Sequence, residues 1–520
     1  MRTASVLGFS LFCLHALLIQ GGRARYRQGP SDAALSAALD TTANTYVLFL
    51  DMREVESLFN TELVVNQAEK YSGNPVLPTG DMNDFDFMRA SSWAGNVIFD
   101  QDEGIFKMWY NGGRNGLNVM AVGYAWSSDG RVWHKPILGL YEFKGSKNNN
   151  ICWRPPNGII FGGSILRESC GHFTAFKDYK ERDPDKRYKG WGENYHEKTK
   201  RNPYFPLYSP DGIHWTLGPT PVISPVGDIG NAFIDDHDPD LRRRIKVYGH
   251  TNSAYGPDIE HCIPNPNNPV IDGANIAGAA KDGLEDTIHL ISVLHYRGYY
   301  IMLYDYNFWL DYHGYKGNVE VRKRDRRVPE PKTGFFTGDT RLAVSRDGVG
   351  KFQRVNPHQP VIARGERGQW DSGFTVTAGP IVRNDRIYIF YSGVDEVAGI
   401  TEPQWTELDA PYAIRTGMAS LGTVTTVPLR VTEAGKARLL INASNLLESR
   451  DWIKVELLDA ATNQPIEGYG RSESDEIVQE GIRIPVHWGK NETLGGVKAS
   501  AIKIRFDLYG KARLHSFHFE

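Results

Sequence analysis

Short stretches of alternating apolar and polar residues, separated by turn residues, recur along most of the chain. Such alternation with a period of two is typical of half-buried β-strands. In five places an apolar segment is followed by a second one rich in aromatic residues, at residues 93–100 with 105–110, 172–176 with 187–191, 231–234 with 245–248, 288–294 with 299–304, and 375–382 with 387–391. Helical periodicity of useful length is confined to residues 51–70, so the pattern predicts an all-β fold.

A tight-turn signal occurs three times between apolar runs. Asp129, Asp211 and Asp347 each precede a glycine and each follow a serine two residues earlier. Glycine accepts the positive φ that a tight hairpin turn demands. Repeated units at a long spacing are typical of propellers and solenoids. Together with the five segment pairs, these turns predict a five-bladed β-propeller over residues 45–422.

The turn signal disappears in the last hundred residues. Apolar segments at 437–441, 453–458, 482–488, 502–508 and 515–519 are separated by turn residues there. We therefore expect a separate β-sandwich accessory domain over residues 423–520. Such a domain either packs against its neighbour or binds sugar, and the packing role is favoured.

Charge and targeting signals narrow the range of partners. The 59 basic and 62 acidic residues nearly cancel, so neither nucleic acid nor a membrane surface is an expected partner. Residues 1–24 combine Arg2, an apolar run and small residues, which predicts a cleaved signal peptide and a secreted or periplasmic protein. The cleaved chain keeps Cys152, Cys170 and Cys262, which allow at most one disulfide, with Cys152 and Cys170 as the preferred pair.

Four segments carry a family resemblance when taken together. They are 106–113 (FKMWYNGG), 183–189 (DPDKRYK), 227–232 (GDIGNA), and Trp370-Asp371 before 387–391 (IYIFY). This set resembles the five-bladed propeller glycosidases of the invertase-like and arabinanase-like families 32 and 43. It is most similar to exported bacterial members whose sandwich carries a Leu-x-x-Asn-Ala segment, here 439–443. The resemblance implies a carbohydrate substrate and O-glycosyl hydrolase activity. The invertase-like motifs Asn-Asp-Pro-Asn, Arg-Asp-Pro and Glu-Cys do not stand here in that form, so catalytic residues cannot be carried over.

The candidate site follows from the geometry of a propeller, in which the loops before the innermost strands converge at one mouth of the central channel. Every unit supplies an acid there, and glycoside hydrolysis needs two carboxyl groups in acid and base or nucleophile roles. A single acid could equally cap a turn or pair with an arginine. The predicted catalytic residues are Asp228, Glu285, Asp286, Asp371 and Asp86, with Asp84 beside the last and with Asp228 and the Glu285-Asp286 pair preferred.

Polar and aromatic residues near the same strand starts are the predicted substrate-binding set. They are Trp93, Arg89, Arg114, Glu168, His172, Asn231 and His250. Trp109 and Tyr391 are expected in the core instead, because strands favour aromatic residues. The acids of 236–240 lack the glycine and glutamate of a calcium loop, so a solvated turn is favoured. Neither zinc spacing nor a phosphate-binding glycine loop is present, so no metal or cofactor is predicted.

Three functions remain open. The leading hypothesis is a secreted glycoside hydrolase that cleaves an oligo- or polysaccharide with paired carboxyl groups. A glycoside phosphorylase on the same fold would need basic residues for phosphate, and Arg89, Arg114 and His250 could supply them. A non-catalytic glycan-binding propeller is the third possibility.

Overall fold

The computed structural model describes most of the chain. The described residues are 39–41, 46–87, 89–114, 119–161, 164–167, 169–221, 226, 228–271, 288, 290–310, 335–357, 359–366, 369–384, 386–394, 401–408, 412–416, 422–431, 434–447 and 451–520. Within these ranges the regular elements are β-strands and short 3-10 helices at Pro184–Lys186, Leu241–Arg243 and Leu494–Gly496. The all-β prediction is confirmed, whereas residues 1–24 lie outside the described part.

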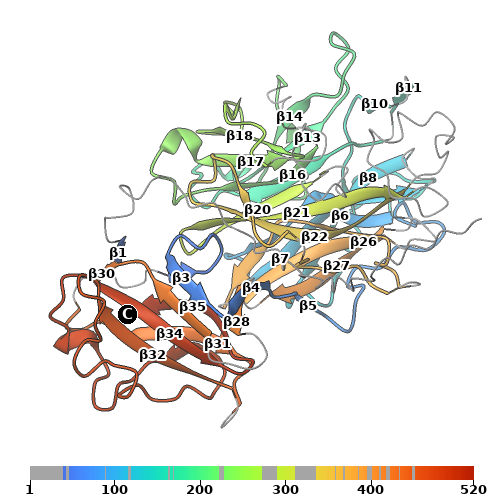
Figure 1. Cartoon of the computed structure of the whole chain (residues 1–520). Helices are drawn as coiled ribbons and strands as arrows, with labels where there is room; N and C mark the ends of the chain where they lie inside the picture. Colours follow the sequence, from blue (N-terminus) through green and yellow to red (C-terminus); the bar gives the residue numbers. More distant parts are fainter. Residues whose placement is uncertain are drawn as a thin grey trace, which may run out of the picture.

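The central part of the chain forms five successive antiparallel runs of strands, here called units one to five (Figure 1). Unit one contains β6 (Arg89–Asp100), β7 (Ile105–Arg114), β8 (Val119–Ser127) and β9 (Ile151–Trp153). Unit two contains β12 (Phe173–Lys177), β13 (Tyr188–Glu193), β14 (Tyr204–Ser209) and β15 (Thr216–Leu217). Unit three contains β16 (Ile229–Ile234), β17 (Ile245–Gly249), β18 (Asn252–Gly256) and β19 (Ile263–Pro264).

Unit four has the same strand order, whereas unit five takes one strand from the chain before unit one. Unit four contains β20 (Ile291–Tyr296), β21 (Tyr299–Leu310), β22 (Phe335–Ser345) and β23 (Gln353–Arg354). Unit five contains β24 (Phe374–Thr377), β26 (Arg386–Val394), β27 (Thr401–Leu408) and β5 (Glu69–Lys70), with β25 (Ile381–Arg383) also paired to β26. A short hairpin of β10 (Ile159–Phe161) and β11 (Ser164–Leu166) lies outside the units. All five predicted segment pairs are antiparallel partners, which confirms this part of the analysis.

Side-chain amides join the first strands of neighbouring units. Asn96 of β6 donates from Nδ2 to the carbonyl of Ala175 in β12 at 2.6 Å. Asn231 of β16 donates to the carbonyl of Val293 in β20 at 2.9 Å and accepts from its N–H at 3.0 Å. Both asparagines are buried. A buried amide that satisfies two main-chain groups fixes the register between strands that share no ladder.

The three Asp-Gly turns have the same geometry, as predicted. Each follows the third strand of its unit, and the glycines have φ of 77° (Gly130), 81° (Gly212) and 68° (Gly348). In each turn the aspartate Oδ1 accepts two main-chain N–H groups, and the preceding serine Oγ accepts the N–H of the glycine. The repeated motif therefore meets the same backbone demand three times.

Buried acids that end or directly follow the first strands of units one, two and three connect each of these units to the next. Asp100 contacts Lys107 of its own unit and Tyr188 of unit two, and Asp178 accepts two hydrogen bonds from Arg244 of unit three, at 2.8 and 3.0 Å. Asp235 is similarly contacted by Lys246 at 3.0 Å and by Tyr300 of unit four. Burial of charge is tolerated here because every carboxylate meets a cation or a hydroxyl donor.

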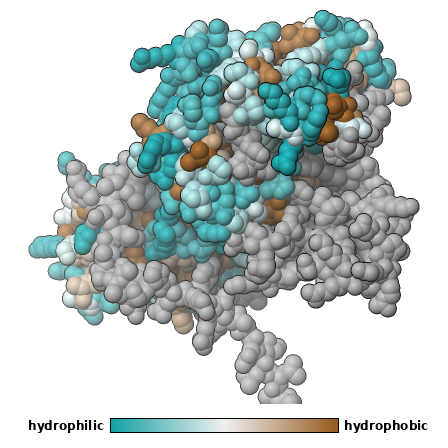
Figure 2. All heavy atoms as spheres, turned by 90° about the horizontal axis from the view of Figure 1, so that it is seen from above, coloured by the Kyte–Doolittle hydropathy of each residue, from teal (hydrophilic) through white to brown (hydrophobic). Residues whose placement is uncertain are grey.

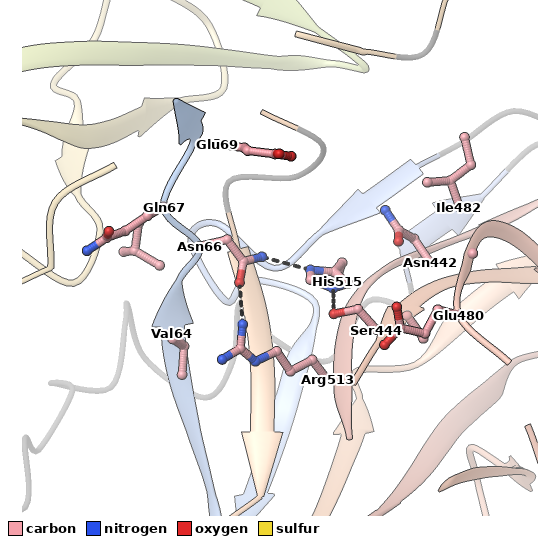
Figure 3. A pocket seen from close by; sticks show the side chains of 13 residues that line it. Val64, Asn66, Gln67, Glu69, Asn442, Ser444, Glu480, Ile482, Arg513 and His515 are labelled. Atoms are coloured by element: carbon pink, nitrogen blue, oxygen red, sulfur yellow. Dashed lines mark hydrogen bonds between the residues drawn. The ribbon is translucent and has the colours of Figure 1, made fainter. Parts of the chain in front are cut away.

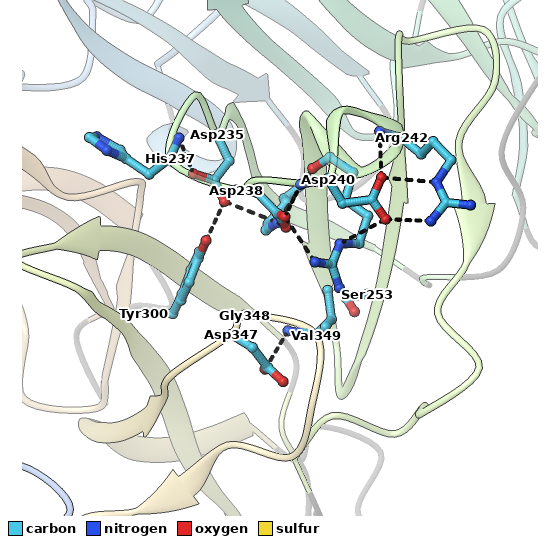
Figure 4. A network of polar contacts seen from close by, with 12 residues as sticks. Asp235, His237, Asp238, Asp240, Arg242, Ser253, Tyr300, Asp347, Gly348 and Val349 are labelled. Atoms are coloured by element: carbon cyan, nitrogen blue, oxygen red, sulfur yellow. Dashed lines mark hydrogen bonds and ion pairs between the residues drawn. The ribbon is translucent and has the colours of Figure 1, made fainter. Parts of the chain in front are cut away.

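The segment 236–240 is only partly the solvated turn that the sequence suggests. Asp238 is buried and pairs with Lys246 at 2.5 Å and with Arg243 at 2.9 Å (Figure 4). Asp240 instead caps the 3-10 helix that begins at Leu241. The prediction is wrong for Asp238, because its cationic partners lie after the turn and the spacing of the acids does not reveal them.

Two six-stranded sheets form the other end of the molecule (Figure 1). One contains β1 (Leu39–Thr41), β30 (Leu429–Val431), β34 (Ile502–Tyr509), β29 (Gly422–Thr426), β3 (Val55–Phe59) and β32 (Trp452–Asp459). The other contains β33 (Gly481–Pro485), β31 (Leu439–Ser444), β35 (Arg513–Phe519), β28 (Tyr412–Thr416), β4 (Thr61–Val65) and β2 (Tyr46–Leu48). One cluster of buried apolar side chains, including Ile441, Val455 and Phe517, draws on both sheets.

Residues 46–65 differ from the sequence analysis in two ways. The segment 51–70, which has helical periodicity, contains β3 and β4 instead. β3 pairs with β29 and β4 pairs with β28, both near the expected domain boundary at residue 423. The sequence pattern instead places residues 45–65 in the propeller. Local alternation cannot identify a partner that lies so far along the chain, because tertiary pairing decides it.

The three cysteines in the described part of the chain form no disulfide. Cys152, Cys170 and Cys262 are all free and buried, so the expected pairing of Cys152 with Cys170 is wrong. Burial raises the pKa of Cys170, to about 12, and that of Cys262, also to about 12. These thiols act as small apolar groups in the core.

The coloured part of the surface in Figure 2 is mainly hydrophilic, with hydrophobic residues scattered over it in small groups. Scattered apolar residues of this kind are normal on a folded surface. In the described part of the chain, no helix has the length and apolar character needed to cross a membrane.

Candidate functional site

Residues from units one, two and three meet where their first strands begin. Arg89 is the first residue of β6, His172 directly precedes β12, and Asp228 directly precedes β16. The second strand of each hairpin is antiparallel to the first, so its end reaches the same place. Glu193 ends β13, and His250 follows β17. We call these five residues the mouth cluster.

Asp228 is the centre of the mouth cluster. Its Oδ2 lies 3.4 Å from Nε2 of His172 and 3.2 Å from Nε2 of His250. The side chain is 36% exposed, which leaves the carboxylate accessible to a ligand. A carboxylate held between two imidazoles and open to solvent can take part in proton transfer.

Two glycines allow the groups of the mouth cluster to approach one another. A Cβ at Gly249 would lie 2.1 Å from the carbonyl oxygen of Asp228, and one at Gly171 would collide with the carboxylate of Glu193. His250 follows Gly249 with φ of 46°, a left-handed conformation that is uncommon for a residue with a side chain. Such local strain is concentrated at functional sites in proteins.

Glu193 lies on the other side of His172. Its Oε2 accepts the main-chain N–H of His172 at 2.9 Å and lies 3.6 Å from Nδ1 of the imidazole. His172 therefore has a carboxylate near each ring nitrogen. Burial alone would lower the pKa of His172, but Glu193 and Asp228 outweigh burial and the Arg89 charge, so that the pKa is raised.

The raised pKa of His172 makes stability depend on pH. A histidine whose pKa is higher in the folded state contributes stability that is fully present below its unfolded pKa of about 6.5. That contribution is lost as the pH rises through the folded pKa. We expect His172→Gln to lower the free energy of unfolding more at pH 6 than at pH 9, measured by urea denaturation at both values. Equal losses at the two pH values would contradict a charged His172.

Arg89 is a partly buried member of the mouth cluster. Burial lowers the pKa of Arg89 to about 10, even though the neighbouring Cys170 acts in the opposite direction. The guanidinium stays charged at neutral pH. Together with His172 and His250, it gives the mouth cluster three basic groups around two carboxylates.

Two of the predicted catalytic acids lie in closely similar ion pairs. Asp86 accepts from Tyr110 at 2.8 Å and from Lys135 at 2.7 Å. Asp371 accepts from Tyr391 at 3.0 Å and from Lys70 at 2.5 Å. Both aspartates are buried. A Cβ at Gly112, two residues after Tyr110, would collide with Asp86 and Phe85. A Cβ at Gly393, two residues after Tyr391, would collide with Asp371 and Trp370 in the same way. This repeated arrangement stabilises units one and five.

The remaining predicted site residues are distributed as follows. The side chain of Asn231 is hydrogen-bonded to the main chain of Val293, as described above. Asp84 is exposed and accepts the N–H of Asp81 at 2.7 Å. Trp93 and Arg114 lie in β6 and β7, but their side chains are outside the described part, as are Glu168, Glu285 and Asp286. Trp109 and Tyr391 are fully buried, which confirms their expected place in the core.

Sequence analysis missed Glu193. The predicted catalytic acids all stand before the first strand of a unit, whereas Glu193 follows Trp191 and Gly192 at the end of a second strand. The sequence contains a usable signal, because Glu193 ends the second strand of its hairpin and so lies where the first strand begins. In the described residues, no group of three or more His, Cys, Asp or Glu has the arrangement of a metal site.

Comparisons with known proteins give distant likenesses. No protein-family model matches the chain, and no curated protein matches it. One solved structure comes from work on the GH130 family of mannoside phosphorylases, described as containing glycoside hydrolases that target β-1,2 mannosidic linkages in Candida mannan. It has 13% identity and a TM-score of 0.44, and the match covers 66% of this chain and 94% of that one.

Two further structures are similar to the same degree. A glycosyl hydrolase from Bacteroides ovatus has 13% identity and a TM-score of 0.43, with 69% of this chain and 97% of that chain covered. Another structure, described as a glycoside hydrolase, has 14% identity and a TM-score of 0.41, with coverage of 66% and 92%. At these values neither a family nor a substrate can be transferred, and the resemblance to families 32 and 43 stays a prediction.

Proposed function

We propose that the chain is a carbohydrate-active enzyme that hydrolyses a glycosidic bond at the mouth cluster. The observation that carries this proposal is the accessible carboxylate of Asp228, held between His172 and His250 with Glu193 behind them. Solvent-open clusters of acids and imidazoles suit proton transfer to and from a neutral polar substrate. The near-zero net charge of the chain agrees with a neutral substrate.

The proposal includes an architecture. Units one to five are the blades of a five-bladed propeller, whose first strands surround a central channel. The two C-terminal sheets are the layers of a β-sandwich. The repeated order of strands, the amide bonds between first strands and the shared apolar cluster of the two sheets support this assignment. We also propose removal of residues 1–24 and export of the mature chain.

Asp228 acts as the base or nucleophile in this proposal. Its carboxylate faces two imidazoles and is open to solvent, an arrangement that suits the attack on an anomeric carbon or the activation of water. The glycosidic C–O bond breaks, the water oxygen bonds to the anomeric carbon, and a second group protonates the leaving oxygen. We assign this protonation to Glu285 or Asp286, which belong to the predicted catalytic residues. Asp86 and Asp371 are assigned to packing, because each is committed to a lysine and a tyrosine.

Phosphorolysis is the second candidate, and one observation favours it. Arg89, His172 and His250 provide three basic groups at the mouth cluster, which could hold inorganic phosphate as the attacking group. Arginine and histidine commonly bind phosphate oxygens through charge-assisted hydrogen bonds. Export argues against it, since free phosphate and recovery of a sugar phosphate are of more use inside a cell.

A single assay separates these functions. The purified chain is incubated with a panel of plant and algal glycans, with and without inorganic phosphate, and the products are separated by chromatography. We expect free reducing sugar at the same rate in both conditions. Sugar 1-phosphate that forms only when phosphate is added would establish phosphorolysis instead. Binding without any product from the panel would leave a glycan-binding propeller as the better description.

A further inference from the structure

A cavity of about 710 Å3 lies between residues 66–68, here called the β4–β5 segment, and strands β31, β33 and β35 of the second C-terminal sheet (Figure 3). Its lining includes Asn66 and Gln67 from the segment, Asn442, Ser444 and His515 from the sheet, and Glu480 directly before β33. None of these residues belongs to the mouth cluster. Cavities of about 300–1,000 Å3 are the usual size of small-ligand sites.

The strand that forms one wall is distorted at the cavity. Asn442, Ala443 and Ser444 are consecutive in β31, yet all three line the cavity. Successive residues of a regular strand point to opposite faces. Here the register of β31 shifts against both of its neighbours at this point, against β33 between Ile441 and Ala443 and against β35 between Asn442 and Ala443. Bulges of this kind redirect side chains next to functional sites.

A chain of hydrogen bonds fixes the polar groups on this wall (Figure 3). Arg513 donates to Oδ1 of Asn66 at 3.2 Å, so the amide NH2 of Asn66 faces Nδ1 of His515 at 2.9 Å. Nδ1 must then accept, and the imidazole proton is on Nε2. That proton is donated to Oγ of Ser444, at 2.7 Å. The hydroxyl proton of Ser444 is consequently directed away from the imidazole.

The direction of the hydrogen bond from His515 to Ser444 excludes Ser444 as a nucleophile. Ser444, His515 and Asn66 have the order of a hydrolase triad, but a catalytic histidine must accept the serine proton at Nε2. His515 holds a proton there and donates it, so it cannot activate Ser444. The arrangement instead presents a fixed hydroxyl, which is what a binding site requires.

The lining indicates a neutral ligand with many hydroxyl groups. Glu69 and Glu480 oppose the single guanidinium of Arg513, which already donates to Asn66, so an anion would find no excess of positive charge. Amides and carboxylates can both pair with hydroxyl groups, which donate and accept. Val64, Val65 and Ile482 add apolar surface for the C–H faces of a ring.

We propose that this cavity is a second, non-catalytic binding site for a short neutral oligosaccharide. The site holds a glycan chain between the second C-terminal sheet and the β4–β5 segment. It is separate from the mouth cluster, where we propose that the chain is cleaved. The segment continues to Lys70, which pairs with Asp371 of unit five. The short segment that lines the cavity with Asn66 and Gln67 is thus connected through Lys70 to unit five.

The test measures binding by the full chain. Asp228→Asn protein is screened on a microarray of plant and algal oligosaccharides, and each glycan bound is titrated by calorimetry. Two changes address the cavity in that background: Asn442→Ala removes an amide, and Ile482→Trp fills space from a side chain that is 46% exposed and therefore tolerant of change. Gln464→Ala removes an exposed amide elsewhere in the C-terminal part and is the matched control.

We expect at least one neutral glycan whose dissociation constant rises tenfold or more in both cavity variants and less than twofold in Gln464→Ala. Such binding would persist even if no glycan were ever cleaved, so the outcome is independent of the proposed hydrolysis. Dissociation constants that change less than twofold in both cavity variants would overturn the proposal, as would the absence of binding to every oligosaccharide on the array.

Discussion

Replacement of Asp228 by Asn is expected to lower turnover by about 10²–10⁴-fold, the usual contribution of a positioned acid or base. The change keeps the shape of the side chain and removes its charge. Because the side chain is 36% exposed, we expect the melting temperature to change little. Initial rates on the glycan identified by the panel, together with thermal unfolding of the same preparations, measure both effects.

Asp371→Asn is the matched control for Asp228→Asn. It makes the same chemical change at a buried site, where Lys70 would lose its negatively charged partner and Tyr391 would lose a charged acceptor. We expect lower thermal stability and nearly unchanged turnover per folded molecule. If Asp371→Asn abolished turnover while Asp228→Asn retained it, the assignment of the two aspartates would be reversed.

Asp100→Asn is expected to cost about 3–5 kcal/mol of folding free energy, because it leaves buried cations without their partner. Asp100 is fully buried and contacts Lys177 at 2.7 Å, Lys107 at 3.1 Å and the hydroxyl of Tyr188. Burial alone would raise the pKa of Asp100, but the hydrogen bonds from Lys177 and Tyr188 lower it to about 2. Urea denaturation at neutral pH measures the loss.

Asp102 provides the control for Asp100. It also pairs with Lys177, at 2.9 Å, but its side chain is 59% exposed, and Asp102→Asn should cost less than about 1 kcal/mol. The sign of the pH effect follows from the lowered pKa of Asp100. Its contribution is present above the unfolded value of about 4 and is lost as the pH falls toward 2. The penalty of Asp100→Asn should therefore shrink between pH 4 and pH 2, and a constant penalty would contradict the ion-pair explanation.

Local signals account for the parts of the fold that could be predicted. The Asp-Gly turns and the paired apolar segments depend on residues within one hairpin, so a single sequence contains them in full. The partners of β3 and β4 could not be inferred, because short alternating strands pair equally well with many edges. The helical periodicity of 51–70 was overridden by this long-range pairing.

The candidate site, like the fold, could be predicted only in part from the sequence. Asp228 and His172 could be predicted as candidates because each directly precedes a recognisable strand, and the structure brings both together with His250. Asp86 and Asp371 have the same sequence signal but lie in ion pairs, since Lys135 and Lys70 reach them from distant segments. Charge pairing over such separations depends on the completed fold, and no local pattern records it.

The pairing of β1 to β4 with C-terminal strands sets an order of events during synthesis. These strands leave the ribosome early, yet their partners β30, β35, β29 and β28 are made only after the five units. Until then β3, with Leu58 and Phe59 still exposed in the finished fold, has an open edge that could pair with another chain. A chain that stops before residue 412 would retain these open edges, so truncation there should produce aggregation rather than a smaller soluble enzyme.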